Sequence, residues 1–158
     1  MTIASSNKIA LNVFGLGSPL GDDQAGWLVV QQLITLGLTQ AMISRNPYEL
    51  LDQLVECTHA VIVDATLSDA PNNVGHVEHF FWPDPRLRSG TKYSTHGMDL
   101  VQILNMAAGL GKLPPKVEIY TVNIAAPNIS IDSVKGMVSA RVMKGIKDIT
   151  DRIWSRIH

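Results

Sequence analysis

Two nearly continuous apolar runs constrain the fold of this 158-residue chain more than any other feature. The first, "KIALNVFGLG" at residues 8–17, ends in glycine, and the second, "HAVIVDAT" at residues 59–66, contains Asp64 at its carboxyl end. A strand that is apolar on both sides is typical of a parallel sheet with helices on both faces, because neither side of such a strand faces water. The two runs therefore predict buried, parallel strands.

The segments around these runs predict an alternation of helices and strands. Residues 23–38 have apolar side chains at helical spacings, with Asp23 as the expected N-cap and Gly37 as the end, and residues 46–57 begin a helix at Asn46 and Pro47. The further predicted elements are a short strand over 41–45, an edge strand or hairpin arm over 75–82, helices over 96–111 and 131–158, and a strand over 114–124. The alternation predicts an α/β fold. We expect a single domain over residues 1–158, built as a three-layer α/β/α sandwich whose Rossmann-like, mostly parallel sheet has one antiparallel or edge strand.

Composition and charge exclude several classes of function. The net charge is −1 and no basic run is present, so neither nucleic acid nor an anionic membrane is an expected partner. No apolar run approaches the length of a membrane span, and the first residues do not resemble a signal peptide, so we expect a cytoplasmic protein. The single cysteine, Cys57, excludes an internal disulfide and is expected to be buried structure rather than a nucleophile.

The turn after the first apolar run, "GLGSPLGDDQAG" at residues 15–26, is acidic. A glycine-rich turn in this position usually binds phosphate, and Gly15 and Gly17 match the first two glycines of a dinucleotide-binding turn. Leu20 occupies the third glycine position, however, and the stretch where a ribose-binding acid should follow contains no Asp or Glu. Asp22 and Asp23 would also repel a phosphate, so dinucleotide binding is disfavoured.

Three side chains with metal-binding or acid–base chemistry are expected at one edge of the sheet. Asp23 follows the first strand, Asp64 terminates a central one, and His96 precedes a helix. Ligands of open α/β sheets bind outside the carboxyl ends of the strands, so these residues are predicted to converge, and two carboxylates with an imidazole suit a divalent metal. Each has a simpler alternative, because Asp23 could cap a helix, Asp64 could cap a turn and His96 could be an ordinary loop histidine.

Three segments, in this order, resemble the hydrogenase maturation endopeptidase family: "GLGSPLGDDQAG", "VIVDA" and "STHGMDLVQILNMAAGLGKLPPKVEIY". The resemblance implies a Rossmann-like sandwich that removes a C-terminal extension from the large-subunit precursor of a nickel-iron hydrogenase after nickel insertion. It also implies that Asp23, Asp64 and His96 are the catalytic and nickel-contacting residues, while Asp22 faces outward or caps. The nickel is expected to belong to the substrate rather than to be held tightly by the protease, which is expected to be a monomer.

The chain departs from the family pattern in three places. Ser18 stands where the family usually has asparagine, "ISRNPYELL" replaces a segment containing Gly-Thr, and "TVNIAAPN" replaces an acidic Gly-Ile-Glu ending. Arg45 and Tyr48 lie in the segment that stands in place of the Gly-Thr region, and both are candidates for partner recognition. The alternative for Tyr48 is packing on the edge of the sheet. The departures also keep open a second function, that of a non-catalytic metal-sensing or assembly paralogue with the same fold.

Overall fold

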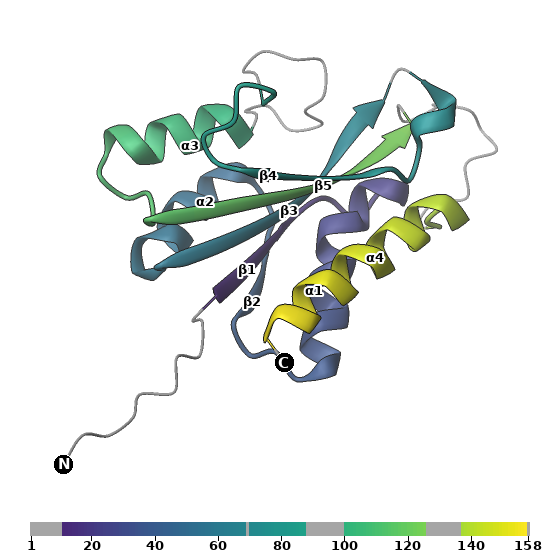
Figure 1. The fold of residues 1–158 in the computed structure, drawn as a ribbon, viewed down its shortest axis with the longest axis horizontal. Coiled ribbons are helices and arrows are strands. Elements are labelled where there is room, and N and C mark those ends of the chain that lie inside the picture. Colours follow the sequence, from purple (N-terminus) through teal and green to yellow (C-terminus); the bar gives the residue numbers. More distant parts are fainter. Residues whose placement is uncertain (1–10, 69, 88–99, 126–136, 158) are drawn as a thin grey trace.

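The computed structural model describes residues 11–68, 70–87, 100–125 and 137–157. In this part of the chain, five strands form one sheet in the order β2-β1-β3-β5-β4 (Figure 1). The strands are β1 (Leu11–Leu16), β2 (Ala41–Ser44), β3 (His59–Ser68), β4 (Val77–Phe81) and β5 (Lys116–Ala125). All neighbouring pairs are parallel except β4 and β5, so β4 is an antiparallel edge strand, as its sequence predicts.

Helices cover both faces of the sheet, which confirms the predicted sandwich (Figure 1). The helix α1 (Ala25–Leu36) lies beside α4 (Ala140–Ile157) on one face, and α2 (Pro47–Gln53) with α3 (Leu100–Gly109) covers the other. Three short 3-10 turns join the elements: η1 (Gly21–Gln24), η2 (Leu54–Glu56) and η3 (Pro71–Asn73). Among the described helices, none has the length and apolar character that a membrane span requires.

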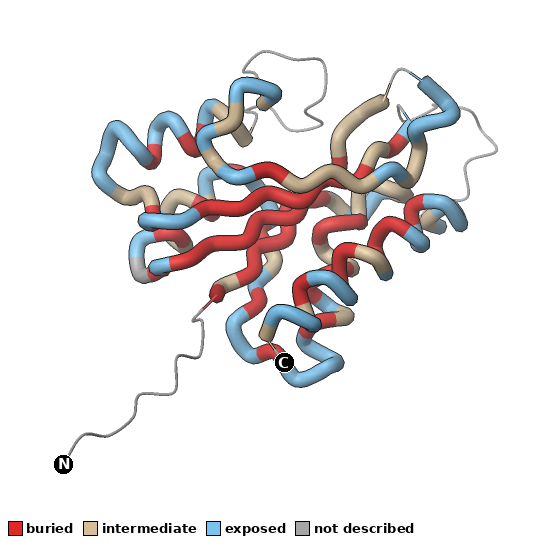
Figure 2. The backbone as a smooth tube through the Cα atoms, viewed as in Figure 1, coloured by how far each residue is buried: buried red, intermediate tan, exposed pale blue. Residues whose placement is uncertain are grey.

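The apolar runs are continuous because each central strand contributes to two hydrophobic cores. In β3, Val61 and Val63 pack in the core under α1 and α4, whereas Ala60 and Ile62 pack in the core under α2 and α3. The strands at the centre of the sheet are accordingly buried along most of their length (Figure 2). Burial of each of these valine and isoleucine side chains stabilises the fold by about 1.5–3 kcal/mol relative to its exposed state.

Close backbone packing explains the glycines around the acidic turn. A Cβ atom on Gly26 would lie 2.1 Å from the carbonyl oxygen of Leu16, and one on Gly15 would lie 2.2 Å from the carbonyl oxygen of Gly26. A Cβ atom on Gly17 would lie 2.5 Å from the carbonyl oxygen of Asp23. These glycines allow the first turn of α1 to rest directly on β1, so their presence needs no dinucleotide to account for it.

The predicted boundaries of α1 and α2 are confirmed at three positions. Gly37, with φ of 113°, ends α1 in the left-handed conformation that favours glycine. The Asn46 side chain accepts a 3.0 Å hydrogen bond from the Glu49 N–H, and Pro47 is the first residue of α2. Cys57 is a free and buried thiol, also as predicted.

Three local predictions are wrong. Asp23 is not the N-cap of α1, because the η1 turn comes first and Gln24 occupies that position. Asp64 does not terminate β3, which continues to Ser68 because β5 remains paired with it that far. The last helix begins at Ala140, so Met137 precedes it, while residues 131–136 of the predicted helix lie outside the described residues.

Candidate active site

The sheet has its topological switch point between β1 and β3. The chain passes from β1 to β2 on one side, whereas β3, β5 and β4 extend the sheet on the other. Ligands of open α/β sheets bind at the carboxyl edge of such a switch point, because the connections leave the two strands in opposite directions. Here η1, which carries Asp23, follows β1, and Asp64 lies on β3.

Asp64 lies level with the end of β1. The last register pair of these strands is Gly15 with Val63, one residue before Asp64, and β1 ends at Leu16. Beyond this point β3 is no longer paired with β1. The Asp64 carboxylate accepts a 2.8 Å hydrogen bond from the N–H of Ala65. Asp64 is therefore mid-strand in β3 but at the carboxyl edge of the switch point.

Burial makes Asp64 a weak acid. Desolvation raises the pKa of this carboxyl group from 3.8 to about 7, against the opposing effect of the Ala65 hydrogen bond, and the negative charge of Asp23 adds to the increase. Asp23 is thus electrostatically coupled to Asp64, and its turn, η1, packs against β3. Two coupled carboxyl groups at a switch point form a site that a cation would stabilise.

The two adjacent aspartates of the turn have different surroundings. Asp22 accepts hydrogen bonds of 2.7 Å from the backbone N–H of Ser139 and 3.0 Å from its hydroxyl group, immediately before α4. The turn itself is closed by a 3.1 Å hydrogen bond from the Ser18 N–H to the carbonyl oxygen of Asp23. Asp22 therefore anchors the start of α4, as expected for the capping member of the pair, and the Asp23 side chain is the one coupled to Asp64.

His96, the third predicted member of the site, lies outside the described residues. Within the described ranges, no group of three or more His, Cys, Asp or Glu side chains has the arrangement of a metal site. The structure thus brings Asp23 near enough to Asp64 for their charges to interact, and the catalytic and metal-contacting roles of all three residues stay predictions.

Sequence patterns alone did not single out one polar residue beside Asp64. Thr121 of β5 is the register partner of Asp64 and is buried. The alternation of β5 could have identified it, because Val117 and Ile119, four and two residues earlier, share its face and are apolar.

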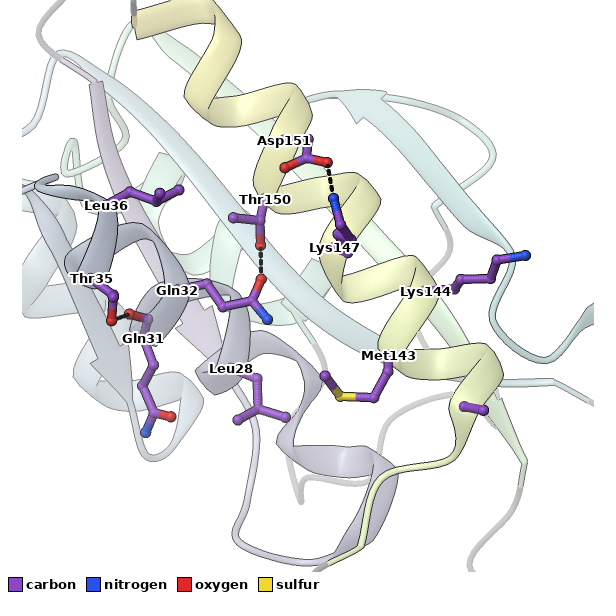
Figure 3. A pocket seen from close by; sticks show the side chains of 11 residues that line it. Leu28, Gln31, Gln32, Thr35, Leu36, Met143, Lys144, Lys147, Thr150 and Asp151 are labelled. Atoms are coloured by element: carbon purple, nitrogen blue, oxygen red, sulfur yellow. Dashed lines mark hydrogen bonds and ion pairs between the residues drawn. The ribbon is translucent and has the colours of Figure 1, made fainter.

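A groove of about 980 Å³ runs between α1 and α4, on the opposite face of the sheet from Ile62 and its core (Figure 3). Its apolar walls include Leu28 and Met143, and a 2.8 Å hydrogen bond joins the Thr150 hydroxyl group to the Gln32 side chain. The only carboxylate among its lining residues, Asp151, accepts a 3.0 Å hydrogen bond from Lys147. The groove therefore lacks the pair of coupled acids found at the switch point.

The segment that replaces the usual Gly-Thr region is folded and accessible. Tyr48 is 56% exposed on α2, so it does not pack on the sheet edge. Arg45 is exposed as well, and its backbone N–H donates a 2.8 Å hydrogen bond to the Glu49 side chain. Both side chains are available to a partner.

Comparison with known proteins gives a family and a fold. A family model of hydrogenase maturation proteases, HycI, matches residues 45–156, which include Asp64 and His96 but not Asp23. A search of curated proteins gives no significant match.

Solved structures of hydrogenase maturation proteases share the fold over nearly the whole chain. The hydrogenase maturating endopeptidase HybD from E. coli is 19% identical, with a TM-score of 0.69 and coverage of 94% of this chain and 92% of that one. The [NiFe] hydrogenase maturation protease HybD from Thermococcus kodakarensis is 22% identical, with a TM-score of 0.70 and coverage of 95% and 100%. The HycI protease from Thermococcus kodakarensis KOD1 is 18% identical, with a TM-score of 0.69 and coverage of 96% and 94%.

Proposed function

The chain belongs to the hydrogenase maturation protease family, and from this premise we propose that it removes the C-terminal extension of a nickel-iron hydrogenase large-subunit precursor after nickel insertion. The observation that carries the proposal is the coupled pair of carboxyl groups, Asp23 and Asp64, at the switch point of the sheet. An acidic turn at this position is unsuited to an anion, whereas it suits a cation presented by another protein.

The residues proposed to carry the reaction are Asp23, Asp64 and His96. Carboxylates and a neutral imidazole are suitable ligands for Ni²⁺, so the three side chains would contact the nickel that is already seated in the precursor. A metal in that position can polarise a carbonyl group or lower the pKa of an attacking water. In the hydrolysis, the water oxygen adds to the scissile carbonyl carbon, the C–N bond breaks, and the leaving nitrogen takes a proton.

The pKa of Asp64 suits this role. A carboxyl group with a pKa of about 7 is shared between its protonated and ionised forms at neutral pH. In the free protein, burial and the nearby Asp23 charge keep Asp64 protonated at lower pH, whereas contact with a cation would favour the ionised form. Arrival of a nickel-loaded precursor would thus release a proton from Asp64 and complete the site.

A processing assay tests the proposed function. The purified chain is incubated with nickel-loaded precursor and, separately, with nickel-free precursor encoded in the same genome, and the mass of the large subunit is measured. We expect loss of the C-terminal extension from the nickel-loaded precursor alone. Asp23→Asn and Asp64→Asn should reduce cleavage by at least about 100-fold, whereas Asp148→Asn, which removes an exposed ion pair with Arg152 on α4, should not.

Two results would contradict the proposal. An unchanged mass with folded protein and nickel-loaded precursor would favour the non-catalytic assembly paralogue. Equal cleavage of both precursors would show that nickel is not what the site recognises.

Metal content provides a further test. Because the nickel is proposed to arrive with the substrate, protein purified without added metal should contain well below one nickel ion per chain when measured by elemental analysis. One firmly retained metal ion per chain would instead indicate an ordinary metallohydrolase.

A further inference from the structure

One face of the two central strands β3 and β5 changes from apolar to polar at Asp64. On the side of α2 and α3, both strands begin with aliphatic residues of the core and continue with polar residues. The aliphatic residues are Ala60, Ile62, Val117 and Ile119, and the polar residues that follow on the same face are Asp64, Thr66, Thr121 and Asn123. The change occurs at the same register position in both strands, where Asp64 pairs with Thr121, so the apolar core on this face ends there and polar side chains follow it.

Thr66 and Asn123 form a fixed pair within this polar surface. They are register partners in the parallel ladder, and the Thr66 hydroxyl group donates a 2.8 Å hydrogen bond to the side-chain oxygen of Asn123. Both residues are half-buried. Residues two apart on one face of a strand are about 6–7 Å apart, so the pair lies about one peptide unit beyond Asp64.

The backbone of Asn123 is also held on the side of β4. Its N–H donates a 2.9 Å hydrogen bond to the carbonyl oxygen of His76, and its carbonyl oxygen accepts a 2.7 Å hydrogen bond from the N–H of Gly75. Neither the backbone nor the side-chain oxygen of Asn123 is therefore free to change partners without breaking a bond. Because these hydrogen bonds fix the Asn123 side chain, its amide N–H groups would lose little conformational entropy on binding an acceptor.

The hydrogen bond from Thr66 does not use the N–H groups of the Asn123 side-chain amide. A primary amide has one carbonyl oxygen and two N–H donors, and the described contact with Thr66 uses the oxygen. In the described part of the chain, no hydrogen bond from the Asn123 amide nitrogen is present. The complementary group for such a donor is a carbonyl oxygen, and a peptide substrate presents one in every residue.

We propose that Asn123 binds a backbone carbonyl group of the peptide that is to be cleaved, with Thr66 as the residue that positions its amide. This inference rests on the proposed function and adds a substrate contact to the same site. The peptide would lie across β3 and β5 so that one carbonyl group meets the Asn123 amide while the neighbouring peptide unit lies at Asp64. Asn123 would then fix the register of the peptide relative to the acidic pair.

Kinetics of precursor cleavage by four variants test the proposal. Asn123→Ala and Asn123→Asp both remove the N–H donors, and only the second adds a charge. Each should lower kcat/KM by about 10–100-fold, because a substrate carbonyl group would lose its hydrogen-bond donor in the bound complex. Thr66→Val keeps the side-chain shape without the hydroxyl group and should lower kcat/KM by about 3–10-fold, whereas Thr66→Ser keeps the hydroxyl group and should stay within about 2-fold of the wild type.

The outcomes separate this inference from the function on which it rests. If the wild type cleaves the precursor and Asn123→Ala has unchanged kcat and KM, the substrate contact is wrong while the protease function stands. If Thr66→Ser loses as much activity as Thr66→Val, the hydroxyl group does not position Asn123. If the wild type does not cleave, both proposals fail. Thermal unfolding of each variant distinguishes substrate binding from a purely structural role. A structural role would lower the melting temperature together with the activity. At equal stability, it would also give Thr66→Val and Thr66→Ser the same kcat/KM.

Discussion

Asp64 lowers the stability of the folded protein at neutral pH, although it belongs to the candidate active site. Its carboxyl group is desolvated within the sheet, and the Asp23 charge lies close enough to raise its pKa further. A group whose pKa is higher in the folded state than in the unfolded state makes the protein less stable as the pH rises. Well below pH 3.8 both states carry the proton, and no such cost arises.

We therefore expect Asp64→Asn to be more stable than the wild type at neutral pH. The difference should be small near the ordinary pKa of 3.8, grow as the pH rises towards about 7, and stay constant above that, because the unfolded state ionises first. We expect an increase of about 1–3 kcal/mol at about pH 8 in the free energy of unfolding of precursor-free protein, measured with urea. Asp148→Asn on α4 should show no such trend, and a pH-independent difference for Asp64→Asn would contradict the assignment.

Asp22 and Asp23 should differ in the same assays although they are neighbours. Asp22→Asn weakens the anchor at Ser139 and should cost about 0.5–2 kcal/mol of stability with little loss of processing, whereas Asp23→Asn should abolish processing and leave the anchor intact. Chemical unfolding and precursor cleavage, measured on both variants, check the assignment. A larger loss of processing from the Asp22 change would reverse it.

At the scale of elements, the position of α1 depends on backbone contact with β1. The helix starts on top of the strand because Gly26 permits an approach that any side chain would prevent. The same contact sets the path of η1 and hence the position of Asp23 relative to Asp64. Close packing and the geometry of the site are thus linked through one glycine.

Gly26→Ala should accordingly be severe, while a second glycine provides a matched control. A Cβ atom on Gly26 would meet backbone atoms on two strands, at 2.1 Å and 2.6 Å, so we expect a loss of about 3 kcal/mol or more, or failure to fold. At Gly109, the last residue of α3, a Cβ atom would have nothing within 4 Å, so Gly109→Ala should be neutral or stabilise by up to about 1 kcal/mol. Thermal unfolding of both variants checks this, and similar effects would contradict the packing argument.

The same elements show what a sequence can and cannot predict. Periodicity and turn residues give the strands, Gly37 and the Asn46–Pro47 helix start, because these features depend on neighbours in the chain. The sequence does not predict the 3-10 turn before α1, nor the contact of its Asp22 side chain with Ser139, 117 residues later. The placement of Asp64 level with the end of β1 likewise follows from strand pairing rather than from the β3 sequence alone.

At the scale of the whole molecule, one fully buried carboxylate joins three strands and a helix. Glu118 of β5 accepts hydrogen bonds of 2.8 Å and 2.9 Å from Arg156 in the last turn of α4, one of 2.9 Å from His79 of β4, and one from His59 of β3. These partners lie 38 to 59 residues away in the sequence, so no local pattern predicts the cluster. It holds the C-terminal helix against the end of the sheet opposite to the acidic site.

The charge of Glu118 is stabilised in the folded state. Burial alone would raise the pKa of Glu118, but the hydrogen bonds from Arg156 and His59 outweigh it and hold the pKa at about 2, below the ordinary 4.5. The sign is the reverse of that for Asp64. Glu118 contributes its full stability above about pH 4.5, and this contribution is lost as the pH falls towards about 2.

Glu118→Gln should therefore destabilise the protein strongly at neutral pH and less in acid. We expect a loss of about 2–4 kcal/mol at pH 7, because the Arg156 guanidinium group loses its counter-ion and the side chains of His59 and His79 lose a hydrogen-bond partner. The difference should be smaller at pH 3, where the stabilising effect of the wild-type carboxylate is reduced. Urea unfolding at pH 7 and pH 3 measures the difference. Asp151→Asn, which removes the exposed Lys147 ion pair on the same helix, should cost less than about 1 kcal/mol at either pH. A cost of Glu118→Gln that stays constant from pH 7 to pH 3 would show that its ionised carboxylate is not what joins α4 to the sheet.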